Sequence, residues 1–318
     1  MIINRWSVSA GAYSTALLTR DGAVVLAGRS AQGERRNAPS KMAYRQVAAY
    51  TTGFYCLDAD GRVSAHGDPY NGSQLGLPTV PLARIAAGNW SGFGLTWHGR
   101  LVAWGQRRDT AMPQGVFCAV VGGGDGGYAL TFPDRRIVPF GSTINNRTAN
   151  LPTGPVLDLA ATTDGAYVLH TDGSVTFFGN DDNNESDALP SAGDQFVAVF
   201  GGRHSGAALR ADGTAHLMGR SSSAADPTQN VAFPSSVSWA SMAFGGEHGV
   251  GISRDGRAYW WGLREGGNDL DWPADATTAG RWGAHSITEL DGEWTEAHAG
   301  AVSASEVWLG GSRLWARP

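Results

Sequence analysis

The sequence predicts an all-β fold, and more narrowly a single closed β-propeller. Three observations lead to this prediction: a pattern of about forty residues that recurs along the whole chain, an Asp-Gly type of turn at its centre, and an excess of glycine and tryptophan. Glycine accounts for 45 of 318 residues, about twice its usual share of roughly 7%. Such a content indicates many tight turns and close backbone contacts.

Each repeat contains an apolar run that ends in small residues, a second run, a turn, and a third run that closes on a large residue and glycine. In residues 198–219 these parts read AVFGG, SGAALR, ADGT and HLMG. Asp-Gly between two apolar runs predicts a hairpin, because glycine adopts the positive φ of a tight turn without strain. The Asp position of the turn is filled, in chain order, by Asp21, Asp60, His98, Asp134, Asp172, Asp212, Asp255 and Gly310.

Eight units are counted in this way. They lie near 6–28, 45–67, 83–105, 117–141, 156–179, 197–219, 239–262 and 294–317. One unit has too small a core to fold alone, so we expect the units to stack radially as blades of one domain, residues 1–318, and to bury their faces against each other. Eight blades are predicted, with seven as the alternative if the C-terminal unit packs differently.

The large side chains that close the third runs are expected to form the core between blades. They are Trp104, Phe140, Phe178, Trp260, Trp261 and Trp315. Cys56 and Cys118 fall in apolar runs of different units, so we expect two buried thiols that form no disulfide.

The repeat resembles that of the regulator-of-chromosome-condensation propellers. The segments GGRHSGAALRADGTAHLMG (201–219), AAGNWSGFGLTWHGRLVAWGQ (86–106) and DGRVSAHGDPYNGSQLGLP (60–78) carry the resemblance. The short period of about 39 residues is similar to that of bacterial members such as the type II β-lactamase inhibitory protein. The resemblance implies a propeller, usually of seven blades, and covers the whole chain. It implies little about function, because the family includes exchange factors, inhibitors and scaffolds.

Composition excludes several functions. The net charge is −5 and no block of Lys and Arg occurs, so nucleic-acid binding is not expected. The first ten residues, MIINRWSVSA, do not read as a secretory signal. No apolar run is long enough to span a membrane, so membrane insertion is not expected. A cytoplasmic or particle-associated location, such as on a virion, is predicted.

No arrangement of residues predicts catalysis, and we expect no enzyme, cofactor or metal. His204 and His248 occupy equivalent positions, in RHSG and EHGV, where a shared metal is one interpretation and a hydrogen bond that holds the next turn is the other. The run NDDNNESD (180–187) lacks the glycine and glutamate of a hand-type calcium loop. It is interpreted as a solvated connector.

One short stretch of each unit varies while its flanks stay regular: the three residues between the first and second apolar runs, here called the slot. In chain order the slots are AYS (12–14), TTG (51–53), NWS (89–91), DGG (125–127), TDG (163–165), RHS (203–205), EHG (247–249) and AVS (301–303). Slots of neighbouring blades should ring one face of the disc, and a varied ring on a constant scaffold suits a binding surface.

The predicted partner-binding residues come from these slots and from the long connector 263–293. They are Tyr13, Trp90, Asp125, Asp164, Arg203, His204, Glu247, His248, Trp272 and Trp282. By its resemblance to the inhibitor-like members of the family, the chain would contact its partner through slot aromatics, here Tyr13 and Trp90. The alternative interpretation is that the slots only form turns.

The predicted function is a non-enzymatic scaffold that docks a protein partner, including the case of a structural or attachment component of a larger particle such as a virion. One alternative is a glycan-binding adhesin, although propeller lectins repeat one residue set in every blade and these slots differ. Another is an inhibitor or regulator of an enzyme or GTPase.

Overall fold

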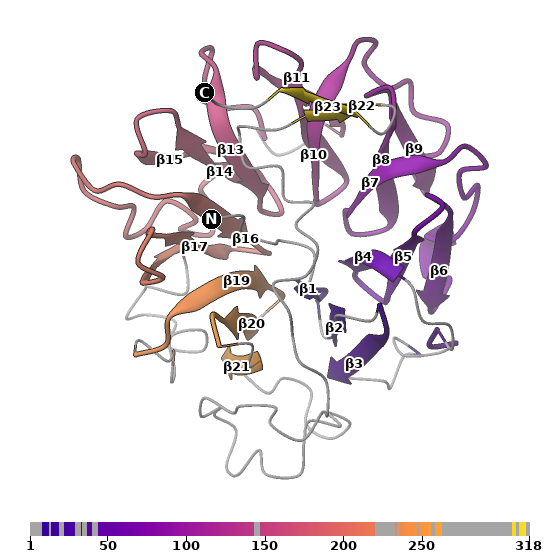
Figure 1. The fold of residues 1–318 in the computed structure, drawn as a ribbon, viewed down its shortest axis with the longest axis horizontal. Coiled ribbons are helices and arrows are strands. Elements are labelled where there is room, and N and C mark those ends of the chain that lie inside the picture. Colours follow the sequence, from indigo (N-terminus) through magenta and orange to yellow (C-terminus); the bar gives the residue numbers. More distant parts are fainter. Residues whose placement is uncertain are drawn as a thin grey trace.

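The computed structural model describes residues 8–12, 14–18, 22–28, 33, 37–39, 44–142, 147–219, 233, 236–246, 248–255, 258–262, 307–309 and 312–315. Seven antiparallel sheets of three strands are arranged around a centre, like blades (Figure 1). Each blade is formed by three strands that follow each other in sequence. This order is the one that the run–turn–run pattern predicts, and the all-β propeller predicted from the repeats is confirmed.

In each blade the first strand is innermost. The inner strands are β1 (Val8–Ala10), β4 (Tyr44–Tyr50), β7 (Leu82–Ala87), β10 (Phe117–Gly123), β13 (Val156–Ala161), β16 (Ala198–Gly201) and β19 (Trp239–Phe244). The middle strands are β2 (Ser14–Leu18), β5 (Gly53–Asp58), β8 (Ser91–Thr96), β11 (Gly126–Thr131), β14 (Gly165–His170), β17 (Ser205–Leu209) and β20 (His248–Ser253). The outer strands are β3 (Val24–Gly28), β6 (Val63–Gly67), β9 (Leu101–Gly105), β12 (Ile137–Gly141), β15 (Val175–Gly179), β18 (Ala215–Gly219) and β21 (Ala258–Gly262).

The described ring has seven blades, the alternative to the eight counted in the sequence. The amide of Gly246 in the seventh blade donates a hydrogen bond of 3.2 Å to the carbonyl of Ala12 in the first. The same kind of bond joins other neighbouring blades, as from Thr51 to Asn89, so the first and seventh blades are direct neighbours. The eighth repeat contributes β22 (Val307–Leu309) and β23 (Ser312–Trp315), which pair with each other and, among the described strands, with no blade.

A second set of backbone bonds joins the blades at their other end. The residue that starts an inner strand donates to the carbonyl of the turn residue in the preceding blade, as Leu82 does to Gly61 and Phe117 does to Gly99, each at 2.8 Å. The same bond joins Val156 to Arg135 at 3.1 Å. The Asp-Gly turn therefore does two things: it reverses the chain within a blade and binds the next blade.

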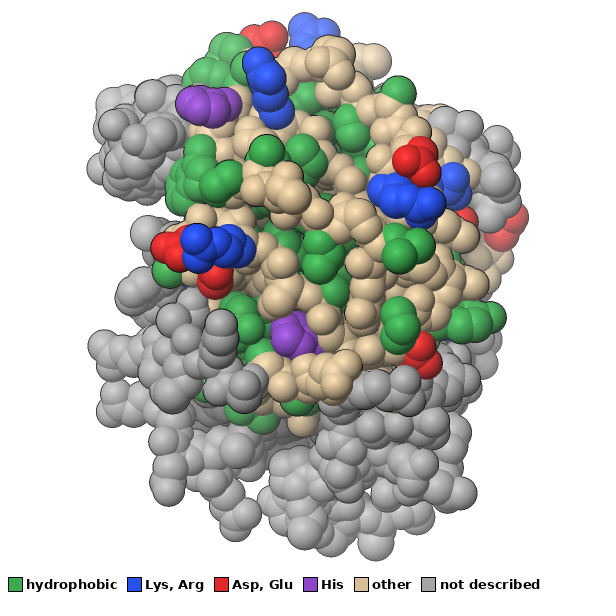
Figure 2. Space-filling view, turned by 90° about the vertical axis from the view of Figure 1, so that its right-hand side faces the viewer, with side chains coloured by type: hydrophobic (Ala, Val, Ile, Leu, Met, Phe, Trp, Pro, Cys, Tyr) green, Lys and Arg blue, Asp and Glu red, His purple; other side chains and the backbone are tan. Residues whose placement is uncertain are grey.

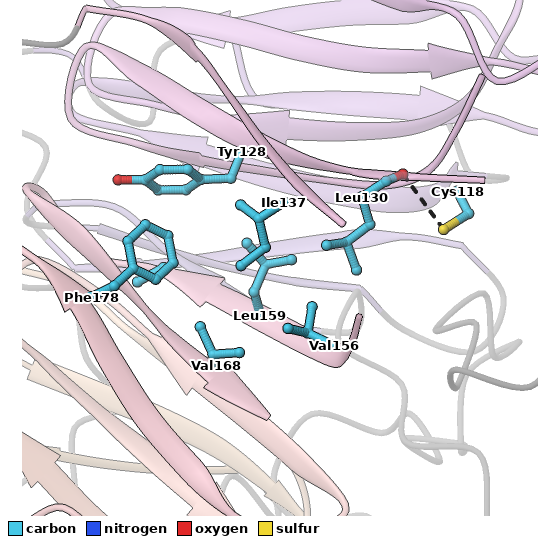
Figure 3. Close-up of a cluster of buried hydrophobic side chains, with 9 residues drawn as sticks. Cys118, Tyr128, Leu130, Ile137, Val156, Leu159, Val168 and Phe178 are labelled. Atoms are coloured by element: carbon cyan, nitrogen blue, oxygen red, sulfur yellow. Dashed lines mark hydrogen bonds between the residues drawn. The ribbon is translucent and has the colours of Figure 1, made fainter. Parts of the chain in front are cut away.

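Side chains fill the space between blades. In the cluster of Figure 3, Tyr128 and Leu130 of β11 face Val168 of β14 and Phe178 of β15, all almost fully buried. Trp104 is completely buried in an equivalent cluster between the second and third blades. Its ring lies so close to Gly92 that a Cβ there would be 1.9 Å from the indole. The prediction that Trp104, Phe140, Phe178 and Trp261 belong to the core is confirmed; the side chains of Trp260 and Trp315 lie outside the described ones.

The two cysteines are buried in different blades and are not bonded to each other, as predicted. Burial raises the pKa of the Cys56 thiol to about 12 and also raises that of Cys118. Both thiols therefore stay protonated and behave as small apolar groups.

Candidate protein-interaction face

The slots lie at one end of the middle strands and ring one face of the disc, here called the slot face. Backbone bonds between successive slots hold them together: Asn89 donates to Gly124 at 2.7 Å, Thr163 to Arg203 at 3.0 Å, and Arg203 to Gly245 at 3.3 Å. Because these bonds use only backbone atoms, slot side chains can vary without loss of the ring. The Asp-Gly turns occupy the opposite end of the middle strands, here called the turn face.

A central cavity of about 480 Å³ lies on the axis, lined by inner-strand residues of all seven blades and, in several blades, by slot residues. Most of its walls are Ala, Gly and Val, as expected where seven strands converge and only small residues fit. Trp90 and Arg203 are among the lining residues, on the third and sixth blades.

Trp90 is half-buried and packs edge-to-face against Tyr70, with ring centroids 5.4 Å apart. Tyr70 begins a short 3-10 helix, η1 (Tyr70–Gly72), in the connector between β6 and β7, and is 58% exposed. Tyr70 was not among the binding residues predicted from the sequence. It is an aromatic residue in the polar connector DPYNGSQLG, and the sequence pattern does not show that this connector returns to the slot face.

Asp125 lies beside this aromatic pair in the next blade. Its carboxylate is 3.5 Å from the guanidinium of Arg107, and both side chains are partly exposed. The Arg107 amide donates to Ser91 Oγ at 3.1 Å, next to Trp90 in the chain. Tyr70, Trp90, Arg107 and Asp125 thus form one patch on the second to fourth blades, here called the aromatic patch. Arg107 was not predicted from the sequence.

Asp164 and Arg203 lie further around the ring, on the fifth and sixth blades. Asp164 is half-buried, and its carbonyl accepts a hydrogen bond from the Asn180 amide. Arg203 is exposed. These two predicted residues are on the slot face, but on other blades than the aromatic patch.

The two slot histidines are buried. His204 Nδ1 lies 2.8 Å from Glu185 Oε1, and Glu185 has no exposed surface. The bond ties the connector 180–187 to the slot, so Glu185 is part of the core although its run was interpreted as solvated. His248 Nε2 lies 2.9 Å from Thr15 Oγ1 and joins the seventh blade to the first. Burial lowers the pKa of His248 to about 4.

Both imidazoles form hydrogen bonds within the molecule. We therefore do not include His204 and His248 among the residues proposed to contact a partner. Tyr13, Glu247, Trp272, Trp282 and the connector 263–293 lie outside the described residues. Within the described residues, no group of three or more His, Cys, Asp or Glu side chains could hold a metal ion.

The side of the disc that carries β6 and β9 shows basic and acidic side chains next to each other in small groups (Figure 2). The described residues form no broad patch of one charge on this side. No helix in the described part of the chain is long and apolar enough to cross a membrane.

No family model matches the chain, and no curated protein matches it in sequence. Solved structures do match. The CRINKLY WD40 ectodomain of the Arabidopsis thaliana receptor kinase ACR4 has a TM-score of 0.68 at 16% identity, over 84% of this chain and 97% of that one. Prp20p from Saccharomyces cerevisiae has a TM-score of 0.59 at 14% identity, over 77% of each chain.

Yeast RCC1 (Prp20) bound to Kap60 has a TM-score of 0.56 at 15% identity, over 72% of this chain and 73% of that one. Identities this low show the fold alone. The chain has an RCC1-like β-propeller fold.

Proposed function

We propose that the chain is a non-enzymatic scaffold that binds a protein partner across the slot face, with Tyr70 and Trp90 as its aromatic anchor. The observation that carries the proposal is the partly exposed edge-to-face pair of these two rings beside the Arg107–Asp125 ion pair. Large aromatic side chains and arginine are enriched among residues that dominate the free energy of protein association.

The rigidity of the ring supports this role. Trp90 is in a slot whose backbone is bonded to both neighbouring slots, and Tyr70 is in a connector held by Tyr55, whose hydroxyl donates to the Ser73 carbonyl at 2.7 Å. An anchor that is already ordered loses little conformational entropy on binding.

The similarity to Prp20p supports protein binding in general and indicates no particular partner. Prp20p is described as binding Gsp1p and histones, which are proteins, so a propeller of this fold can serve as a protein-binding platform. The closeness to short-repeat bacterial inhibitors and the role in a virion stay predictions.

The test is to replace Trp90 with alanine. Proteins captured by the wild-type chain from its native source would be identified and produced, and their affinity measured by calorimetry. Trp90→Ala should weaken binding by about 2 kcal/mol. It should leave the melting temperature nearly unchanged, because a half-exposed ring contributes little packing. Tyr70→Ala should weaken binding in the same direction.

Two control variants make this test specific. Trp97→Ala removes a half-buried indole on the turn face, where the Arg45 guanidinium lies 5.0 Å from the ring centroid, and should not change the affinity. Trp104→Ala removes a core indole and should destabilise the fold by about 3–5 kcal/mol. Equal affinity of wild type, Trp90→Ala and Tyr70→Ala for the captured partner would remove the basis of the proposal.

A further inference from the structure

The walls of the central cavity carry a single charge among the lining residues that the structure describes, and that charge is the guanidinium of Arg203. The other lining residues are apolar or neutral and polar, such as Asn89 and Thr163. A cavity with one cation and no described acid at its walls favours a negatively charged group over a positive one.

Arg203 is held in place by its backbone while its side chain is exposed. Its amide donates to Gly245 and its carbonyl accepts from Thr163, so the residue is bonded to both neighbouring blades. Among the ion pairs of the described residues, none includes the Arg203 guanidinium.

Three further arginines of the described residues lie near the slot face and are already engaged; Arg108 pairs with Asp109. Arg107 pairs with Asp125. Arg147 is buried and donates to the carbonyls of Ser142 and Gly123. Among the described residues, Arg203 is therefore the cation at the cavity that an incoming group can use.

We propose that the mouth of the central cavity accepts an acidic side chain from an extended segment of the protein partner, with Arg203 as its counter-ion. Trp90 lines the same mouth from the opposite side of the ring, so such a segment can contact the aromatic patch as well. This inference rests on the proposed function and names the chemistry of the partner.

The probe is a fluorescein-labelled extended peptide of alternating Glu and Ser, and its matched peptide has Gln in place of Glu. Binding of each is followed by fluorescence anisotropy at low and moderate salt. The wild-type chain should bind the Glu peptide about tenfold more tightly than the Gln peptide, as expected for one charge-assisted pair. Added salt should reduce the difference.

Arg203→Gln should abolish the preference for the Glu peptide, and Arg203→Lys should retain part of it. Arg62→Gln is the matched control, because Arg62 is exposed but lies at the Asp-Gly turn on the turn face; it should leave the preference intact.

Equal binding of the two peptides by the wild type, or a preference that persists in Arg203→Gln, overturns the inference. If the peptide result is negative but Trp90→Ala still weakens binding of the captured partner, only the acidic segment is rejected and the proposed function stands. If neither Trp90→Ala nor Arg203→Gln changes the affinity for the captured partner, the inference and the proposed function both fail.

Discussion

Two histidines in equivalent slots have different partners in the structure. His204 is paired with the buried carboxylate of Glu185, whereas His248 is bonded to the hydroxyl of Thr15. The sequence pattern indicates that the position suits an imidazole, but it does not indicate the partner, because each partner comes from a different element. Glu185 is 19 residues from His204, and Thr15 is 233 residues from His248.

The pairing of His248 predicts a dependence of stability on pH. The imidazole has a pKa of about 4 in the fold because burial disfavours its charged form, against about 6.5 in the unfolded chain. Between these values the unfolded state binds more protons, so stability falls as the pH drops from about 6.5 to 4. The full effect is about 3 kcal/mol.

Urea denaturation at pH 7.5 and pH 4.5 measures this contribution. His248→Gln keeps a polar group for Thr15 but cannot titrate, so its loss of stability at pH 4.5 should be smaller than that of the wild type by about 2.5 kcal/mol. His98→Gln, at an exposed turn position, should behave like the wild type. An identical pH dependence in wild type and His248→Gln would show that the imidazole does not titrate in this way.

At the scale of elements, the Asp-Gly turn is both a hairpin and a junction. Gly99 has a φ of +73°, and a Cβ there would lie 2.7 Å from the Phe117 carbonyl oxygen that belongs to the next blade. Gly99→Ala should therefore lower the free energy of unfolding by about 2 kcal/mol or more, since the left-handed conformation alone costs roughly 1–2 kcal/mol.

Gly154 is the matched control, because nothing lies within 4 Å of a Cβ placed there. Gly154→Ala should be neutral or stabilising by up to about 1 kcal/mol, through the entropy of the unfolded chain. Denaturant midpoints of the two variants measure the difference, and an equal effect of both substitutions would contradict the double role of the turn.

The strands and turns were predictable because they depend on local periodicity and turn chemistry. Trp104 and Cys56 could be assigned to the core for the same reason. Tyr70 and Arg107 could not be assigned to the slot face, because both are in connectors, whose course depends on contacts between blades. The hydrogen bond from the Leu82 amide to the Gly61 carbonyl could not be predicted from the sequence either, because it joins backbone atoms and depends on no particular side chain.

At the scale of the whole molecule, the number of blades depends on which repeat forms the blade that packs against the first one. Counting repeats predicts eight, but the backbone bond from Gly246 to Ala12 closes the described ring after seven. Repeat counting cannot detect closure, since a unit inside the ring and a unit outside it can have the same pattern.

A chain that ends at Gly262 tests this closure. It should unfold cooperatively, with a urea midpoint close to that of the full chain, because β22 and β23 pair only with each other among the described strands. Circular dichroism and urea denaturation provide the measurement. Loss of cooperative folding in the shortened chain would show that the eighth repeat belongs to the ring.

The contact between the first and last blades also has a consequence for the order of folding. Thr15 and His248 are 233 residues apart, roughly six times the separation of Thr51 and Asn89, which join neighbouring blades. The entropy lost on closing a chain loop grows with the logarithm of its length, so this junction costs about 1.5 kcal/mol more to form than the others. Blades should therefore assemble on their sequence neighbours first, and the ring should close last.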